Sequence, residues 1–226
     1  MRILAIDTAL EACSAALLDG DTVVAEETQE MARGHAEALM PMLARLRENA
    51  AFYFNVIDRI AVTVGPGSFT GLRVGIAAAR GIALAAGKPA VGITTLEALA
   101  APLIASDASS PVVSVIDARH NHVYLQAFGT DGDDLVSARV VSVPGALELI
   151  VPLRPRLVGN AAKLLAAAWP ADQPAPAAVN QQAAPQIDWV GRLGQLAETG
   201  AAPPKPFYLK APDAQPVAAS PLAAQP

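Results

Sequence analysis

The order of strand-like and helical segments in this chain occurs twice. The first half contains three short strand-like runs followed by a helix, a strand and a second helix, and the text from about residue 111 repeats that order. Local sequence recurs as well, because Ile6-Asp7-Thr8 opens one copy and Ile116-Asp117-Ala118 opens the other. The pattern predicts a duplicated βββαβα unit, and a chain built in this way is expected to fold into two α/β lobes.

The expected elements can be placed by residue. In the first copy, strands are expected at residues 2–9, 13–20, 22–30, 59–64 and 90–93, and helices at 36–49, 71–86 and 95–105. In the second copy, strands are expected at residues 111–118, 122–129, 138–143 and 155–160, and helices at 144–151, 161–169 and about 186–198. The Pro-, Ala- and Gln-rich text from about 170 to 185 predicts a connector without a lasting regular element.

These elements define the expected domains. The first lobe is expected over residues 1–105 and the second over residues 106–210, with the last helix returning to pack on the first lobe. The text after residue 210 offers little to bury, so residues 211–226 are expected to form a loose tail.

Composition argues against several classes of protein. With 226 residues, 53% of them hydrophobic and 16% charged, the chain has enough apolar material for one large core or two modest ones. The formal net charge of −5 argues against binding nucleic acid alone, because such binding depends on Lys and Arg displacing counterions. Arg73, Arg80 and Lys88 interrupt the longest apolar stretches, and no signal-like segment precedes the first strand. With Cys13 as the only cysteine, a cytoplasmic protein without a membrane span is expected.

A glycine-rich loop, GPGSFTGLRVG at residues 65–75, links an expected strand to an expected helix. Glycines at a helix N-terminus can bring backbone N–H groups close to a phosphate. The loop lacks the Gly-Lys-Ser/Thr of a P-loop, and Thr70 stands where a dinucleotide fingerprint has its third glycine. The favoured interpretation is therefore a tight turn, a capped helix start and a close backbone approach. These roles fall on Gly65 and Gly67, on Ser68 or Thr70, and on Gly71 and Gly75.

The duplicated unit resembles the plan shared by actin, sugar kinases and the heat-shock ATPases, which predicts a two-lobed α/β fold of the actin-like (ASKHA, RNase H-like) class. Several stretches sharpen the resemblance: ILAIDT, VGPGSFTGLRVGIAAARGIALA, GITTLEALA, DARHNHVYLQAF and PFYLKAPDA. Together they closely resemble the bacterial TsaB (YeaZ) family, over nearly the whole chain to about residue 215.

Resemblance to that family implies a function. The chain would be a non-catalytic dimerisation and activating subunit for TsaD, in the machinery that attaches a threonylcarbamoyl group to the adenosine next to the anticodon of tRNAs reading ANN codons. The implied partners are TsaD in a heterodimer, TsaE in the larger complex, a second copy when the chain is alone, and tRNA only through the complex. No cofactor is expected, although ATP or ADP at the subunit junction stays open.

The aspartate that opens each copy has two interpretations. Actin-like enzymes keep an acidic residue at this strand end for Mg-nucleotide and follow it with a glycine-containing turn, whereas Asp7 and Asp117 are followed by side chains that would crowd a phosphate. Both aspartates are therefore either strand-end caps or parts of a vestigial nucleotide site. That vestigial site would comprise Asp7, Thr8, Gly65, Gly67, Ser68 and Asp117.

No catalytic or metal-binding residue is expected. TsaD carries a His-Leu-Glu-Gly-His segment whose two histidines bind the catalytic metal, and the corresponding segment here begins with Thr95 and ends with Leu99. Neither side chain can replace imidazole as a ligand of a first-row metal. His120 and His122 lie two apart on an expected strand, but no third ligand or HExxH motif accompanies them, so an exposed strand edge is favoured.

The helix that begins near His35 carries more apolar surface than one core contact requires. Three of the four methionines lie in Met31–Met42, and methionine is an adaptable filler of binding surfaces. In the TsaB family this helix and the next one contact TsaD; a helix wholly inside its own lobe is the alternative. Arg73 and Arg80 lie seven apart and so on one helix face, where they either border that contact or are a pair of solvated charges. The residues expected to bind a partner are His35, Leu39, Met42, Leu43, Leu46, Arg73, Ile76 and Arg80.

Two other functions compete with the subunit role. The first is a small ATPase or phosphotransferase that uses Asp7, Asp117 and the Gly65 loop. The weaker one is a glycoprotease-like peptidase, for which the sequence offers no clear pair of nucleophile and base. The segment Phe52-Tyr53-Phe54 is more apolar than the family leads us to expect, and extra burial is its only assigned role.

Overall fold

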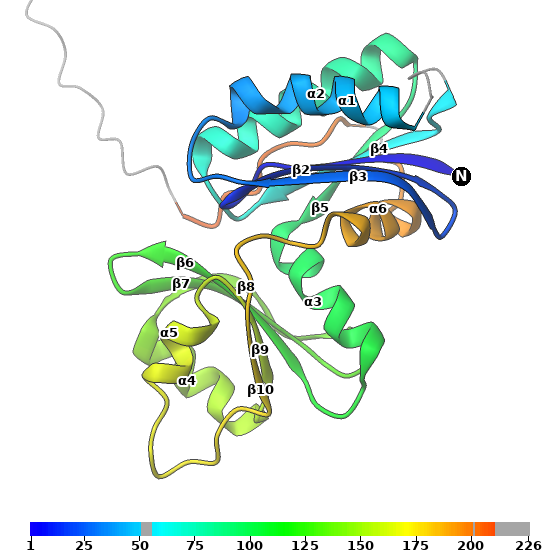
Figure 1. Cartoon of the computed structure of the whole chain (residues 1–226). Helices are drawn as coiled ribbons and strands as arrows, with labels where there is room; N and C mark the ends of the chain where they lie inside the picture. Colours follow the sequence, from blue (N-terminus) through cyan, green and yellow to red (C-terminus); the bar gives the residue numbers. More distant parts are fainter. Residues whose placement is uncertain (51–55, 201, 211–226) are drawn as a thin grey trace, which may run out of the picture.

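A computed structural model describes residues 1–50, 56–200 and 202–210, which form two α/β lobes (Figure 1). The first lobe has a sheet of order β3-β2-β1-β4-β5, and the second has a sheet of order β10-β9-β6-β7-β8. The first sheet contains β1 (Arg2–Asp7), β2 (Ala12–Asp19), β3 (Thr22–Glu30), β4 (Arg59–Gly65) and β5 (Ala90–Thr94). The second contains β6 (Val112–Arg119), β7 (His122–Phe128), β8 (Asp134–Ser142), β9 (Arg156–Gly159) and β10 (Ala178–Gln181).

The two sheets have the same topology, which confirms the predicted duplication and the actin-like fold class. In each sheet the first three strands form an antiparallel meander, and the last two pair in parallel beside its first strand. Helices supply the parallel crossovers, as that geometry requires. The crossovers are α1 (His35–Asn49), α2 (Phe69–Ala86), α4 (Val143–Ile150) with the short 3₁₀ helix η2 (Val151–Leu153), and α5 (Ala162–Ala167). Helices α3 (Thr95–Ser106) and α6 (Ile187–Leu196) each follow the last strand of a copy.

The connector expected at residues 170–185 does contain a strand, so the prediction is wrong at that point. Strand β10 pairs in parallel with β9, from Ala178 opposite Arg156 to Gln181 opposite Gly159. Four residues between prolines have little strand preference of their own. The hydrogen bonds of the neighbouring strand, which are tertiary contacts, stabilise this edge strand. Phe52-Tyr53-Phe54 and the tail at 211–226 lie outside the described residues.

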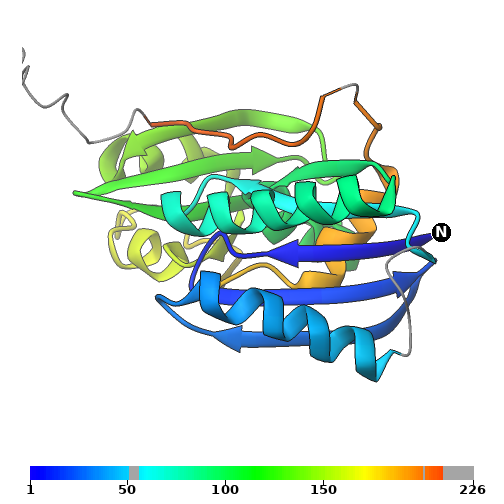
Figure 2. The ribbon, with the colours of Figure 1, turned by 90° about the horizontal axis from the view of Figure 1, so that it is seen from above.

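The first sheet is covered on both faces (Figures 1 and 2). Helices α1 and α2 cover one face, and their buried side chains join Leu4, Ile6 and Val62 in one apolar cluster. Helix α6 covers the other face, where Ile187 and Val190 belong to a second cluster with Ile3 and Leu18. The last helix of the chain therefore packs on the first lobe.

The final helix of each copy packs on the sheet of the other copy. Helix α3 follows β5 of the first sheet and packs on β6 of the second, where the Ser114 hydroxyl donates to the Leu96 carbonyl at 2.7 Å. Helix α6 follows β10 of the second sheet and packs on β1 of the first. This exchange joins the two lobes through two buried helices rather than through a single linker.

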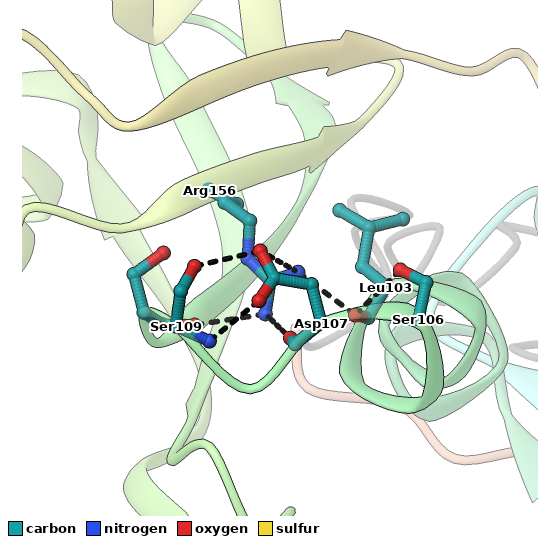
Figure 3. Close-up of polar contacts among 6 residues, drawn as sticks. Leu103, Ser106, Asp107, Ser109 and Arg156 are labelled. Carbon is teal, nitrogen blue, oxygen red and sulfur yellow. Dashed lines mark hydrogen bonds and ion pairs between the residues drawn. The ribbon is translucent and has the colours of Figure 1, made fainter.

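An arginine at the start of the fourth strand of each copy holds the C-terminal end of the exchanged helix. Arg59 donates to the carbonyls of Gly194, at 2.7 Å, and Ala197, at 2.7 Å. In the second copy, Arg156 donates to the carbonyls of Leu103, Asp107 and Ser110 at 2.8, 2.5 and 2.9 Å (Figure 3). The last carbonyls of a helix have no partner within the helix, and these guanidinium groups donate to carbonyls at and just beyond the ends of α6 and α3.

Helix α2 is long and apolar enough to cross a membrane by length and composition alone, with a mean hydropathy of 1.3 over 18 residues. This is weak support for a membrane span, because a helix in a protein core passes the same test. Here α2 packs on β4 and α1, and a third of its residues are buried.

Candidate functional site

The loop at residues 65–75 packs against the turn after β1, which confirms the close-packing interpretation. A Cβ placed on Gly67 or Gly71 would come within 3.0 Å of the Ala9 or Thr8 carbonyl oxygen, a distance that real Cβ atoms essentially never show. A Cβ on Gly75 would meet the Thr8 hydroxyl in the same way. Three glycines are therefore needed because the β1 turn lies directly on the first two turns of α2.

Several polar backbone groups of this loop have partners inside the protein. The Ser68 N–H donates to the Ala9 carbonyl at 2.7 Å, and the Thr8 hydroxyl donates to the Gly71 carbonyl at 2.7 Å. The Ser68 hydroxyl caps α2 by accepting from the Gly71 N–H at 3.3 Å, as predicted. A phosphate would have to displace these contacts and the β1 turn itself. The N–H groups of Ser68 and Gly71 are therefore not free to bind a nucleotide phosphate.

Asp7 and Asp117 each close a turn at the end of a strand. An Oδ1 of Asp7 accepts from the Ala9 N–H at 3.1 Å, and Oδ1 of Asp117 accepts from the Arg119 N–H at 2.7 Å. Both contacts span two residues, which is the geometry of an Asx turn. The arrangement supports the interpretation that both aspartates are strand-end caps.

The Asp7 carboxyl is fully buried, and only one of its oxygens has partners. Oδ1 also accepts from the Thr63 hydroxyl at 2.5 Å, whereas Oδ2 has no partner among the described residues. Burial raises the pKa of Asp7 above its ordinary value of 3.8, and the hydrogen bonds from Thr63 and Ala9 only partly oppose that rise. The folded state therefore favours the neutral acid.

We expect Asp7→Asn to raise the thermal unfolding temperature at neutral pH. Because the folded-state pKa is raised, the neutral acid stabilises the fold fully below the ordinary range near pH 4, and this contribution is lost as the pH rises through the raised value. The amide cannot ionise, so its advantage over the parent should grow with pH, as measured by thermal unfolding at a series of pH values. Thr63→Val removes a hydrogen bond that lowers the pKa of Asp7, so the stability that comes from the neutral acid should be lost at a higher pH than in the parent. A difference that stays constant with pH would contradict this account.

A cleft of about 710 Å³ lies where the two lobes meet. Its walls come from the turn after β1, the start of α2, the end of β6 and the C-terminal segment at 208–210. The charged and exposed aromatic side chains of its lining are Glu11, Arg33, Phe69, Asp117, Arg119, Tyr208 and Lys210. Of the residues assigned to a vestigial nucleotide site, Gly67, Ser68 and Asp117 line the cleft, whereas Asp7, Thr8 and Gly65 are buried away from its surface.

Most of the apolar residues predicted to bind a partner lie in the core instead. Leu39, Met42, Leu43 and Leu46 are at most 1% exposed and belong to the apolar cluster of the first lobe. Ile76 is also buried, and the buried His35 ring donates from Nε2 to the Leu10 carbonyl at 3.0 Å. These six assignments are corrected, because the buried stripes of α1 and α2 pack on the sheet of their own lobe.

The outward face of α2 is largely apolar, whereas that of α1 also carries Glu37, Arg45, Arg47 and Glu48. Arg73 and Arg80 are exposed on α2, and Leu84 on the same helix is 86% exposed. Met40 on α1 is 56% exposed. The other exposed residues are small on α2, namely Ala77, Gly81 and Ala85, while α1 adds Ala36 and Ala44 beside its charged side chains. Sequence reasoning could have found this face from the positions between the core residues, had the core stripe been assigned first.

The residues examined as metal ligands are not grouped. Thr95 and Leu99 are fully buried in α3. His122 donates from Nδ1 to the His120 carbonyl at 2.7 Å, and both residues are exposed. Within residues 1–50, 56–200 and 202–210, no three His, Cys, Asp or Glu side chains are placed to hold a metal ion.

Comparison with known proteins relates this fold to a family. The family profile described as "TsaD: tRNA N6-adenosine threonylcarbamoyltransferase" matches residues 22–184. The tRNA threonylcarbamoyladenosine biosynthesis protein TsaB of Buchnera aphidicola is 30% identical over 165 residues, which make up 70% of this chain and 74% of that protein. The chain belongs to the TsaB (YeaZ) family. The solved structure of YeaZ from Pseudomonas aeruginosa agrees, with a TM-score of 0.75 and 27% identity over 92% of this chain and 99% of that one.

Other relatives match over a shorter stretch. TsaB of Escherichia coli is 40% identical over 131 residues, which cover 58% of this chain. The alignments reach 56% of that protein and 52% of TsaB from Haemophilus influenzae, so the chain spans about half the length of these curated relatives. The family is named for tRNA threonylcarbamoyladenosine biosynthesis.

Proposed function

We propose that this chain is a non-catalytic partner subunit that activates a TsaD-type transferase in the formation of threonylcarbamoyladenosine on tRNA. The observation that carries the proposal is the exposed face of α2, where Leu84 lies among the small residues Ala77, Gly81 and Ala85. A contiguous apolar surface on a folded protein marks an interaction site, and small residues allow another helix to approach closely. Without TsaD, the same face would pair two copies of the chain.

The chemistry itself is assigned to the partner. The two positions that correspond to the metal-binding histidines of TsaD carry Thr95 and Leu99, and both side chains lie in the core, away from any solvent-filled site. In the Gly65 loop, the Ser68 N–H is bonded to the β1 turn and the Gly71 N–H to the Ser68 hydroxyl. Neither feature favours the ATPase or phosphotransferase alternative. A role for this chain in holding the partner in a competent arrangement needs no reacting group of its own.

We expect Leu84→Glu to weaken association with TsaD by at least about tenfold while leaving thermal unfolding unchanged. The side chain is 86% exposed in the free chain, so the substitution costs the fold little, but it would place an unpaired carboxylate in the interface. Affinity is measured by titration calorimetry alongside unfolding of the free variant.

The matched control for Leu84 is Leu164→Glu, on α5 of the second lobe. Leu164 is also exposed, at 44%, but lies outside the proposed interface. It should bind TsaD as the parent does. Leu39→Asp should unfold the chain, since Leu39 is 1% exposed and in the core. If Leu84→Glu binds TsaD with the parent's affinity, the outward face of α2 is not the contact.

Reconstitution tests the subunit role directly. With threonylcarbamoyl-AMP and tRNA, the chain alone should form no modified nucleoside, and addition of TsaD with TsaE should restore formation. Measurement of threonylcarbamoyladenosine by mass spectrometry after nuclease digestion gives the result. Modified tRNA made by this chain without TsaD would overturn the assignment of chemistry to the partner.

A further inference from the structure

Two aromatic rings lie stacked and exposed at the cleft between the lobes. Phe69, the first residue of α2, and Tyr208, in the C-terminal segment, are each 44% exposed. Their ring centroids are 5.5 Å apart with an interplanar angle of 25°. The Arg73 guanidinium lies 3.8 Å from the centroid of Phe69. We call Phe69 and Tyr208 the aromatic platform.

Backbone hydrogen bonds near the two residues, rather than burial of the rings in an apolar core, hold the aromatic platform in place. The neighbouring Phe207 N–H donates to the Val64 carbonyl at 2.7 Å, which attaches the C-terminal segment to the end of β4. Phe69 is fixed by the capped start of α2. Flat rings prearranged at a surface offer stacking to a planar ligand at little further loss of conformational entropy.

The charge of the cleft is opposite to that of the whole chain. Its lining includes the cations Arg33, Arg119 and Lys210 and the carboxylates Glu11 and Asp117, a balance of +1 in a protein with a formal net charge of −5. Among the described residues, the guanidinium groups of Arg33 and Arg119 have no ion pair or hydrogen bond. The cleft therefore favours an anion against the overall field of the protein.

Arg119 reaches the cleft on an unusual turn. The residues Arg119, His120 and Asn121 have φ values of 63, 52 and 58°, and they are three of the four non-glycine residues with positive φ in the described parts of the chain. Residues other than glycine rarely adopt a positive φ. Each one that does so destabilises the fold by about 1 kcal/mol or more. The β6–β7 turn therefore holds Arg119 in an arrangement that local preference disfavours.

We propose that the cleft binds single-stranded RNA, with a base stacked on the aromatic platform and neighbouring phosphates beside Arg33 and Arg119. Stacking surfaces combined with dispersed cations are the usual means of binding single strands. A free nucleotide fits less well, because its phosphates need converging donors, and the N–H groups of Ser68 and Gly71 in the Gly65 loop are already bonded. This inference rests on the proposed function, in which the complex must hold a tRNA loop.

The aromatic platform is tested with Phe69→Leu and Tyr208→Leu, which keep apolar side chains but remove the rings. The probe is a fluorescein-labelled single-stranded oligoribonucleotide with the sequence of an anticodon loop, followed by anisotropy with the full chain, alone and with TsaD. The parent alone should bind weakly, with a Kd of about 10⁻⁴ to 10⁻⁶ M. Each variant should lose about five- to a hundredfold in affinity.

The cations are tested through the salt dependence of binding. Arg119→Gln should reduce the slope of log K against log salt by about 0.7, because one phosphate contact on a single strand is lost. A substitution that only perturbed the fold would not lower the slope by the amount expected for one phosphate contact. The control is Arg139→Gln on β8, whose exposed guanidinium donates only to the nearby Ser137 carbonyl, and it should leave the slope unchanged.

Several outcomes would overturn this inference. They are unchanged RNA affinity in both ring variants, an unchanged slope in Arg119→Gln, or displacement of the RNA by equimolar AMP or ATP, which would indicate a site for free nucleotide. Loss of TsaD affinity in Phe69→Leu with normal RNA binding would make the platform a protein contact. In each case the Leu84→Glu result stands separately, so failure of the RNA site is distinguishable from failure of the proposed function.

Discussion

Gly71→Ala should destabilise the chain by at least about 2–3 kcal/mol, whereas Gly81→Ala on the same helix should stabilise it. The added Cβ at Gly71 meets the carbonyl oxygen of Thr8, which is backbone and cannot rotate away. Relieving the clash would separate α2 from the β1 turn and stretch the hydrogen bond from the Thr8 hydroxyl to the Gly71 carbonyl. For a chain of this size the unfolding temperature should fall by roughly 4–12 °C.

Gly81 is the matched control because it receives the same substitution in a different environment. No atom lies within 4 Å of a Cβ built there, and the residue is exposed in the helix interior. Alanine has the higher helix propensity, so a gain of about 0.5–1 kcal/mol is expected. Thermal and urea unfolding of both variants measure the difference. Equal effects at the two positions would show that helix propensity, rather than contact with the β1 turn, explains the glycines.

Arg156→Met should cost about 3 kcal/mol of unfolding free energy. The residue is 6% exposed, and its guanidinium is the hydrogen-bond donor to the Asp107 and Ser110 carbonyls and an ion-pair partner of Asp107 at 3.7 Å. Methionine has a similar apolar stem but no donor, so these carbonyls would lose their partner at the end of α3 (Figure 3). The loss should appear in denaturant unfolding as a lower midpoint.

Two further substitutions separate the donor role of Arg156 from its charge. Arg156→Lys keeps the charge but lacks the planar fork, and it should recover only part of the lost stability. Arg139→Met removes an exposed arginine and should change stability by no more than about 0.5 kcal/mol. If Arg156→Met matches Arg139→Met, the contacts at the end of α3 contribute nothing measurable to stability.

The order and type of nearly all elements could be predicted from the sequence. Alternation and helical spacing of apolar residues are local properties, and the glycine spacing at residues 65–75 identified a turn and a close approach before either neighbour was known. The repeat then determined the topology, because the second sheet follows the connections of the first. The recognisable motifs also identified the family.

Only the tertiary structure determines which surfaces pack against other elements of the chain and which stay exposed. Apolar spacing on α1 shows that one stripe is buried but not by what, and so Leu39 and Met42 were assigned to a partner although the lobe's own sheet covers them. Strand β10 forms only because β9 lies beside it. Arg59 and Arg156 gave no local signal, since their acceptors lie at the ends of distant helices. The same holds for Phe69 and Tyr208, whose stacking depends on where the C-terminal segment returns to the fold.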